Sequence, residues 1–292
     1  MKPLIRAALV LGLLLEVACL PKTIPPPPPQ PAKVAVVLGA GVSRGFAHVG
    51  VLKVLEAQKV PIHLIVGTSA GSFVGSIYAS GIDAFHVQKM ALAIQKDEVV
   101  DLTIPDNGFI RGEKLESFVN KAVQNAAIER LKIRFRAVAT NVQTGEEVVF
   151  VTGNTGKAVR ASCSIPGVFQ PVRIGDKSYV DGGLVSPVPV NAARKAGADV
   201  VIAVDISAGV AKTLPQGILE TILQSIDIMY AKIAEVQIRN ADVVIRPRVS
   251  HINSSDFDRR HEAILEGEKA AAETLPQIQQ ILNKLRKEGR LP

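Results

Sequence analysis

The segment "HLIVGTSAGSFVG", residues 63–75, places Ser69 in a turn that has a glycine two positions to each side. The apolar run before the turn predicts a buried strand, and "SFVGSIYASG" after it predicts a helix that Gly81 ends. A Gly-x-Ser-x-Gly turn between a strand and a helix is typical of a nucleophilic serine, because side chains at Gly67 and Gly71 would collide with the tight backbone. The helix start also directs N–H groups and a positive dipole end toward the serine oxygen. The alternative is a glycine-rich turn in which Ser69 only caps the helix.

A second glycine turn comes earlier, in "LGAGVSRGFAHVG", residues 38–50. A dinucleotide site would need glycine in place of Arg44 and an acidic residue at the end of the next strand, which instead closes on Val66. The pattern favours an anion-stabilising loop, in which backbone N–H groups and the Arg44 charge face Ser69 across neighbouring parallel strands. The alternative for Arg44 is a surface ion pair.

Serine needs a base, and two kinds of residue compete for that role. Only His251 and His261 come late enough for the serine–acid–histidine order of α/β-hydrolases, and neither follows a strand in a recognisable short loop with turn glycines. Asp181, in "KSYVDGG", follows a short predicted strand and precedes Gly182 and Gly183, so its carboxylate can accept the serine proton directly. From this turn alone, an ordinary Asp-Gly hairpin is the simpler interpretation. The other histidines lie inside predicted elements and are interpreted as structural: His48, His63 and His86.

Predicted strands alternate with predicted helices from Lys33 onward. This order predicts an α/β fold of three layers with a mostly parallel central sheet. A helical pattern runs through "DAFHVQKMALAIQKDE", and another begins at about Asp258. No internal repeat or later proline-rich linker divides the chain, so residues 33–292 are predicted to form one domain.

The first 32 residues are predicted to lie outside that domain. A basic end and the short apolar stretch "AALVLGLLL" indicate a signal peptide, residues 1–18. Small residues end at Cys19, as at a bacterial lipoprotein cleavage site, although Glu16 stands where that pattern has an aliphatic residue. Residues 19–32 contain "PPPPPQP", a stiff spacer. We therefore expect an exported lipoprotein, anchored through Cys19 and facing the periplasm; the alternatives are an uncleaved anchor, or a soluble periplasmic or secreted protein.

Composition narrows the range of partners. The chain has 292 residues, of which 47% are hydrophobic and 21% charged, enough for a packed core. The formal net charge is +7, but the basic residues are interspersed with acids and aromatics make up only 4%, so no nucleic-acid partner is expected. A membrane surface with anionic headgroups fits the charge weakly. No cofactor or metal is expected, and the sequence predicts no oligomeric state.

Taken together, "GAGVSRG", "GTSAG" and "DGG", in this order, resemble the motifs of the bacterial patatin-like phospholipases, and "ASCSIPGVFQPV" resembles that family's helix-then-proline block. The resemblance runs from about Lys33 to about Ser207 and implies a patatin-like fold. Members cleave acyl esters of lipids with a Ser–Asp dyad, so by position it implies Ser69 as nucleophile and Asp181 as proton acceptor. It also implies an oxyanion loop and motif glycines: Gly39, Ala40, Gly41 and Arg44, and Gly45, Gly67, Gly71, Gly182 and Gly183.

The resemblance implies a serine acyl hydrolase that cleaves fatty-acyl esters of phospholipids or related lipids. The loop reads Gly-Ala-Gly where many members have three glycines, but alanine still offers its N–H. The rival from another class is a catalytically silent lipid-binding or scaffolding protein on the same fold. A nucleotide-dependent enzyme is disfavoured by Arg44 and by the missing acid.

Overall fold

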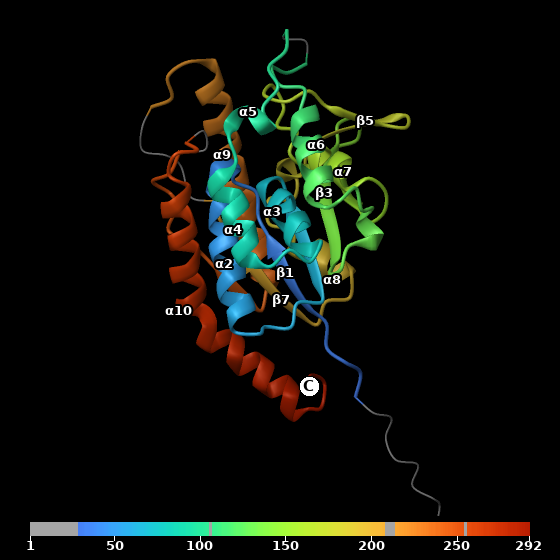
Figure 1. The fold of residues 1–292 in the computed structure, drawn as a ribbon, viewed down its shortest axis with the longest axis vertical. Helices are drawn as coiled ribbons and strands as arrows, with labels where there is room; N and C mark the ends of the chain where they lie inside the picture. Colours follow the sequence, from blue (N-terminus) through green and yellow to red (C-terminus); the bar gives the residue numbers. More distant parts are fainter. Residues whose placement is uncertain (1–28, 105–106, 208–213, 254–255) are drawn as a thin grey trace, which may run out of the picture.

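A mixed β-sheet runs through the middle of the molecule (Figure 1). The computed structural model describes residues 29–104, 107–207, 214–253 and 256–292. The strands are β1 (Val34–Leu38), β2 (Leu64–Thr68), β3 (Arg134–Asn141), β4 (Glu147–Phe150), β5 (Val172–Ile174), β6 (Lys177–Asp181), β7 (Val200–Val204) and β8 (Val243–Ile245). Their order is β5-β6-β3-β2-β1-β7-β8, with β4 pairing β3 off this path. The run from β3 to β8 is parallel, and the remaining pairings are antiparallel, so the predicted mostly parallel sheet is confirmed.

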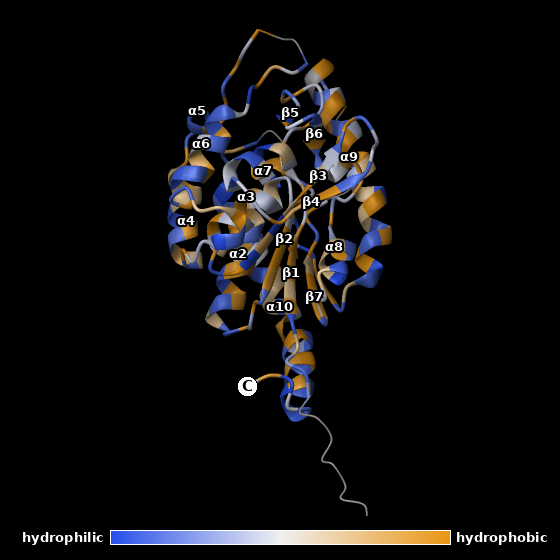
Figure 2. Cartoon of the chain, turned by 90° about the vertical axis from the view of Figure 1, so that its right-hand side faces the viewer, coloured by the Kyte–Doolittle hydropathy of each residue, from blue (hydrophilic) through white to orange (hydrophobic). Residues whose placement is uncertain are grey.

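Helices cover both faces of the sheet and complete the predicted three layers (Figure 2). The helices are α2 (Phe46–Ala57), α3 (Ala70–Ala79), α4 (Ala84–Ala93), α5 (Lys96–Val99), α6 (Glu113–Ala122), α7 (Thr155–Ser162), α8 (Val190–Lys195), α9 (Ile218–Gln237) and α10 (Arg260–Lys287). Short 3-10 turns are η2 (Val42–Gly45), η3 (Ile128–Arg130), η4 (Gly182–Leu184) and η5 (Ile238–Asn240). In Figure 2, α2 and α4 lie on one side of the strands, and α8 and α9 lie on the other.

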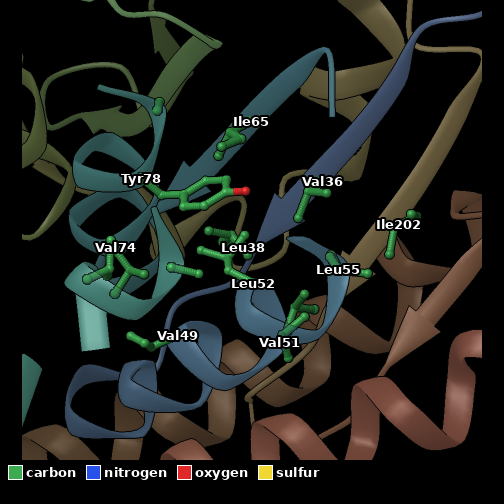
Figure 3. Packing of buried hydrophobic residues seen from close by; sticks show 14 of the residues in the cluster. Val36, Leu38, Val49, Val51, Leu52, Leu55, Ile65, Val74, Tyr78 and Ile202 are labelled. Atoms are coloured by element: carbon green, nitrogen blue, oxygen red, sulfur yellow. The ribbon is translucent and has the colours of Figure 1, made fainter. Parts of the chain in front are cut away.

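The strand sequences explain the two covered faces. Successive side chains of a strand point to opposite faces of the sheet. Val36 of β1 therefore joins the larger core cluster, whereas Val37 joins the smaller cluster that contains residues of α8. Figure 3 shows the larger cluster, in which Leu38 packs near Leu52 of α2. Each fully buried side chain of this kind contributes roughly 1.5–3 kcal/mol to folding.

The pairing of β3 brings the ends of β2 and β6 together. Val138 of β3 pairs with Thr68 of β2 and with Val149 of β4, so β2 and β4 flank β3 on opposite sides. Ala139, the next residue of β3, pairs with β4 and with Asp181 of β6. Since a strand has only two edges, β6 pairs with β3 along the same edge as β2, beyond the point where β2 ends. The residue after Thr68 and the last residue of β6 therefore meet at that edge.

One predicted helical pattern is interrupted. The segment "DAFHVQKMALAIQKDE" forms two helices, α4 and α5, because Ile94 has an extended ψ of 128° and buries its side chain. Gln95 then begins α5 with a capping box to Glu98. The end of α4 is held by Arg260, whose Nη1 donates to the carbonyls of Leu92 and Ile94 at 3.1 and 2.6 Å. Sequence periodicity does not reveal this partner, which lies more than 160 residues away along the chain.

The predicted signal peptide, Cys19 and most of the proline-rich linker lie outside the described residues. In the part of the chain that the structure describes, no helix is both long and apolar enough to span a bilayer.

Candidate active site

Ser69 lies on a strained turn between β2 and α3. Its φ of 53° and ψ of −124° are unfavourable for a residue with a side chain, and such strain is characteristic of a nucleophile on a strand-to-helix turn. The Ser69 N–H donates to Oγ of Ser162 at 2.9 Å, and that Oγ donates to the carbonyl of Val138 at 2.5 Å. Ser162 at the end of α7 thus fixes the turn to β3, a role that sequence reasoning missed. The Ser69 side chain makes no capping bond, contrary to the alternative interpretation of this turn.

The motif glycines allow three segments to approach Ser69. A Cβ on Gly67 would lie 2.5 Å from the carbonyl oxygen of Gly71, and one on Gly71 would lie 2.0 Å from that of Leu38. A Cβ on Gly45 would lie 2.5 Å from Cβ of Ala70, so η2 and the start of α3 are in direct contact. Since real Cβ atoms are essentially never so close, larger residues at these positions would push the glycine loop away from the serine turn.

Asp181 ends β6 on the edge of β3 next to the serine turn. It is completely buried, and its Oδ1 accepts from the N–H of Gly183 at 2.7 Å. Burial raises the pKa of Asp181 to about 6, and the Ser69 hydroxyl, the Gly183 N–H and the Tyr230 hydroxyl act against that rise. Oδ2 is buried without a partner at hydrogen-bond distance and angle among the described residues. The carboxylate therefore has an acceptor oxygen available for a proton.

The glycine loop offers fewer oxyanion donors than predicted. The N–H of Gly39 donates to the carbonyl of Val204 at 3.1 Å, and that of Ala40 to the carbonyl of Pro187 at 2.8 Å. These two groups are therefore already occupied by neighbouring loops. Within the described chain, the N–H groups of Gly41 and Val42 have no such partner. Among the described residues, Gly41 is the predicted loop residue whose backbone N–H has no backbone acceptor. Val42, which lines the same cavity as Ser69, has a second such N–H.

Arg44 is buried and does not offer its charge to a ligand. Its Nη2 lies 3.0 Å from Oδ2 of Asp227, and its Nε donates to the carbonyl of Ile252 at 2.9 Å. Its side chain is only 1% exposed. Instead of placing a positive charge near the oxyanion, Arg44 fixes the glycine loop through these buried contacts. Neither the predicted charge at the oxyanion nor the alternative of a surface ion pair describes this residue, because its partners on α9 and the loop after β8 enclose it.

Three histidines that could compete for the role of base have other partners or lie at the surface. His48 is buried, its pKa is lowered to about 4 by desolvation, and its Nε2 is 2.8 Å from the carbonyl oxygen of Gly39. It therefore supports the glycine loop as a neutral ring. His251 is exposed and 2.7 Å from Glu262, and His261 is exposed at the start of α10. Among the described residues that line the cavity beside Ser69, none is a histidine.

An apolar cavity of about 250 Å³ opens from Ser69. It runs between α2, α3, α4 and α6, and Cys163, Ile165 and Leu223 also line it. Phe73 of α3 and Phe118 of α6 stack in its wall with ring centroids 5.7 Å apart. Burial raises the pKa of the Cys163 thiol well above its ordinary range, so this side chain acts there as an apolar group. A lining of this kind suits a hydrocarbon chain rather than a charged ligand.

Comparison with known families supports the resemblance carried by the motifs. The model of the family described as "Patatin-like phospholipase" matches residues 36–194, more than half of the chain. The chain belongs to the patatin-like phospholipase family. The match spans the glycine loop, the serine turn and Asp181, whereas α9 and α10 lie beyond it.

Several known proteins resemble the chain in sequence or in fold. An NTE family protein of Mycobacterium bovis is 37% identical over 60% of this chain and 49% of its own length. Lysophospholipase NTE1 of Debaryomyces hansenii is 36% identical over 59% of this chain and 12% of its own length. The alignments thus span about half or less of these relatives. VipD of Legionella pneumophila, at 13% identity, has a TM-score of 0.60 over 85% of this chain and 67% of its own, which is a likeness of fold.

Proposed function

We propose that the protein is a serine acyl hydrolase of lipid esters, with Ser69 as nucleophile and Asp181 as base. The observation that carries this proposal is the shared edge of β3, where the strained Ser69 turn and the buried carboxylate of Asp181 meet beside an apolar cavity. Family membership supports the same chemistry, because family relatives are named lysophospholipases. A fluorophosphonate probe, which reacts with activated serines, tests the proposal on wild type and Ser69→Ala.

The reaction follows from the positions of these groups. Asp181 accepts the hydroxyl proton as Oγ of Ser69 attacks the acyl carbonyl carbon. The carbonyl oxygen gains negative charge and is stabilised by the N–H groups of Gly41 and Val42. Asp181 then returns the proton to the leaving alcohol as its bond to the acyl group breaks. Water attacks the acyl-enzyme in the same way and releases the fatty acid.

The raised pKa of Asp181 suits a base. At a pKa of about 6 the group is mostly ionised at neutral pH, yet it is a stronger base than an exposed aspartate. The ionised form is required, so kcat/KM is expected to rise with pH through about 6 and to level off above it. Burial, the largest cause of the shift, also excludes bulk water from the carboxylate.

The apolar cavity would hold the acyl chain of the substrate. Its walls are almost entirely hydrocarbon and aromatic, and it leads from Ser69 toward α4 and α6. Ala91 of α4 is a small side chain in this lining, whereas Ala93, two residues later, is exposed and outside it. These two alanines form a matched pair for testing the chain site.

Replacing Ala91 by phenylalanine is expected to shorten the preferred acyl chain. Excluding three or four methylenes from an apolar site costs about 0.8 kcal/mol each, so kcat/KM for a long-chain ester should fall about 100-fold. A butyrate ester should be hydrolysed at the wild-type rate. The measurement is kcat/KM for p-nitrophenyl esters of increasing chain length in both alanine variants. Equal chain-length profiles for Ala91→Phe and Ala93→Phe would show that the acyl chain binds elsewhere.

We propose a membrane location, with Cys19 as a lipid anchor, from the leader sequence. Exposed apolar side chains near the cavity suit the same environment: Phe109 is 45% exposed and is followed by Ile110, which lines the cavity. Leu102 and Ile104, in the same connection between α5 and α6, are also exposed. Such side chains favour contact with lipid over contact with water.

Cys19→Ser is expected to release the protein from the membrane fraction, because two or more acyl chains are needed for firm anchoring and the serine accepts none. Hydrolysis of a dispersed short-chain ester should be unchanged, whereas hydrolysis of bilayer lipid should fall with the local substrate concentration. Fractionation of cells that express wild type or Cys19→Ser measures the first effect. Equal membrane retention of both would make the apolar leader or the domain surface the anchor.

A silent lipid-binding protein is the second candidate function. Such a protein would retain the apolar cavity and would leave a fluorophosphonate unreacted. The enzyme is favoured by the intact serine turn, by the buried Asp181, and by the Gly41 and Val42 N–H groups, which have no backbone partner in the described part of the chain.

A further inference from the structure

Tyr230 of α9 lies against the turn that carries Asp181. The side chain is only 1% exposed, and a Cβ on Gly183 would lie 2.2 Å from its Cζ and 2.5 Å from its hydroxyl oxygen. The ring thus fills the space that the glycine leaves. Since the Gly183 N–H donates to Oδ1 of Asp181, the tyrosine hydroxyl and the carboxylate flank the same residue.

The described part of the chain leaves two buried polar atoms at this turn outside normal hydrogen-bond geometry. Among the described residues, neither Oδ2 of Asp181 nor the Tyr230 hydroxyl meets another group at normal hydrogen-bond geometry. A buried polar group without a partner is costly, and nearly all such groups in folded proteins are paired. An ionised carboxylate only accepts, whereas a tyrosine hydroxyl donates, so these two atoms are complementary.

We infer that Tyr230 is a positioning residue for Asp181. Its hydroxyl donates a hydrogen bond to Oδ2 of Asp181 when the carboxylate is ionised. This role rests on the proposed function, because it matters for catalysis only if Asp181 is the base. The hydrogen bond would fix the orientation of the carboxylate toward Ser69 and keep it ionised at neutral pH. Two contacts, Gly183 to Oδ1 and Tyr230 to Oδ2, would then hold the base from two sides.

A second contact of α9 supports this role. Asp227 precedes Tyr230 by one helical turn, and its carboxylate is 3.0 Å from the Arg44 guanidinium, which holds the glycine loop. The same face of α9 therefore contacts both the turn of the base and the loop of the oxyanion donors. Helix α9 lies beyond residues 36–194, which the family model matches. Both contacts are therefore made by residues of α9 that lie outside the matched range.

The groups that face Asp181 determine how its pKa should change when the Tyr230 hydroxyl is removed. They are the Ser69 hydroxyl after β2, the Cys163 thiol at the end of α7, the Gly183 N–H in η4 and the Tyr230 hydroxyl in α9, with Asp227 one turn away and paired to Arg44. Burial and the nearby Asp181 charge keep the pKa of Tyr230 well above its ordinary value, so it remains a donor. Burial of Asp181 raises its pKa, and the Tyr230 hydroxyl is one of the contacts that lower it. Removing that hydroxyl should therefore raise the pKa of Asp181 further.

The test is Tyr230→Phe, which keeps the ring and removes only the hydroxyl. The acid limb of kcat/KM for a short-chain ester should move up by about one pH unit, which corresponds to losing one hydrogen bond to a charged group. At pH 6.5 this shift should lower kcat/KM about threefold, with nearly full recovery at pH 8.5 and little change in KM. Tyr179→Phe is the matched control, because Tyr179 is also buried and lies on β6 two residues before Asp181.

A thermal measurement separates this contact from the proposed activity. Because the bond stabilises the ionised carboxylate, its contribution is present above the folded pKa of about 6 and is lost as the pH falls through it. Tyr230→Phe should therefore lower Tm by about 3 °C at pH 8 and by little at pH 5. The inference would be overturned if Tyr230→Phe left both the acid limb of kcat/KM and the Tm at pH 8 unchanged, or raised that Tm. In that case the Tyr230 hydroxyl would make no stabilising bond to Asp181. The Tm comparison holds even if the wild type hydrolyses no ester.

Discussion

Ser69→Ala should reduce ester hydrolysis by at least about 10⁴-fold and abolish labelling by a fluorophosphonate, because it removes the atom that forms the acyl-enzyme. The fold should remain, since the Ser69 N–H, not its side chain, makes the contact with Ser162. Tm is expected to stay within about 3 °C of wild type, the range of a small change without a cavity. The measurement is kcat/KM and probe labelling of purified wild type and variant, each with a thermal melt.

Ser76→Ala provides the control for this result. Ser76 lies on α3, the helix that follows the Ser69 turn, is also buried, and donates its hydroxyl to the carbonyl of Phe73 at 2.9 Å. Labelling and hydrolysis should remain close to wild type in this variant. The double variant Ser69→Ala with Asp181→Asn should be little worse than Ser69→Ala alone, because residues that act as a unit have non-additive effects. Near-wild-type hydrolysis by Ser69→Ala would refute the proposed function.

The strands, the serine turn and the Asp181 turn could be predicted because each is encoded locally. β-branched runs followed by glycines mark the ends of β1 and β2, and the Ser69 strain follows from the spacing of Gly67 and Gly71. The three-layer fold follows in turn from the alternation of strands and helices. The meeting of Ser69 with Asp181 required a resemblance to a known family, because it depends on the register of β3 against β2 and β6.

What could not be predicted depends on partners far away in the sequence. Arg44 and Asp227 are 183 residues apart, and no local pattern indicates that α9 covers the arginine. The N–H groups of Gly39 and Ala40 looked available in the sequence, but the carbonyls of Val204 and Pro187 occupy them. The break after α4 is another such case, since Arg260 satisfies carbonyls at the end of that helix. Only the folded chain shows which backbone groups are already paired.

Asp181→Asn should lower kcat/KM by at least about 10³-fold, because asparagine matches the shape of the turn but cannot accept the Ser69 proton. The Gly183 N–H can still donate to the amide oxygen, so the turn should persist and Tm should change little at neutral pH. The wild-type rate should fall below pH of about 6 as Asp181 is protonated, and the residual rate of the asparagine variant should lose that limb. The measurement is the pH–rate profile of both proteins on a short-chain ester.

His251→Ala and His261→Ala decide between this dyad and a triad with a histidine base. Both side chains are exposed, and His251 is engaged by Glu262, whose carboxylate also binds Arg259. Each alanine variant should therefore keep its rate within about twofold of wild type, the range expected of surface changes away from the reacting groups. A loss of 100-fold or more at either histidine, with Asp181→Asn active, would assign the proton to a conventional triad. The buried, strand-edge position of Asp181, directly beside the serine turn, is the reason to expect the opposite.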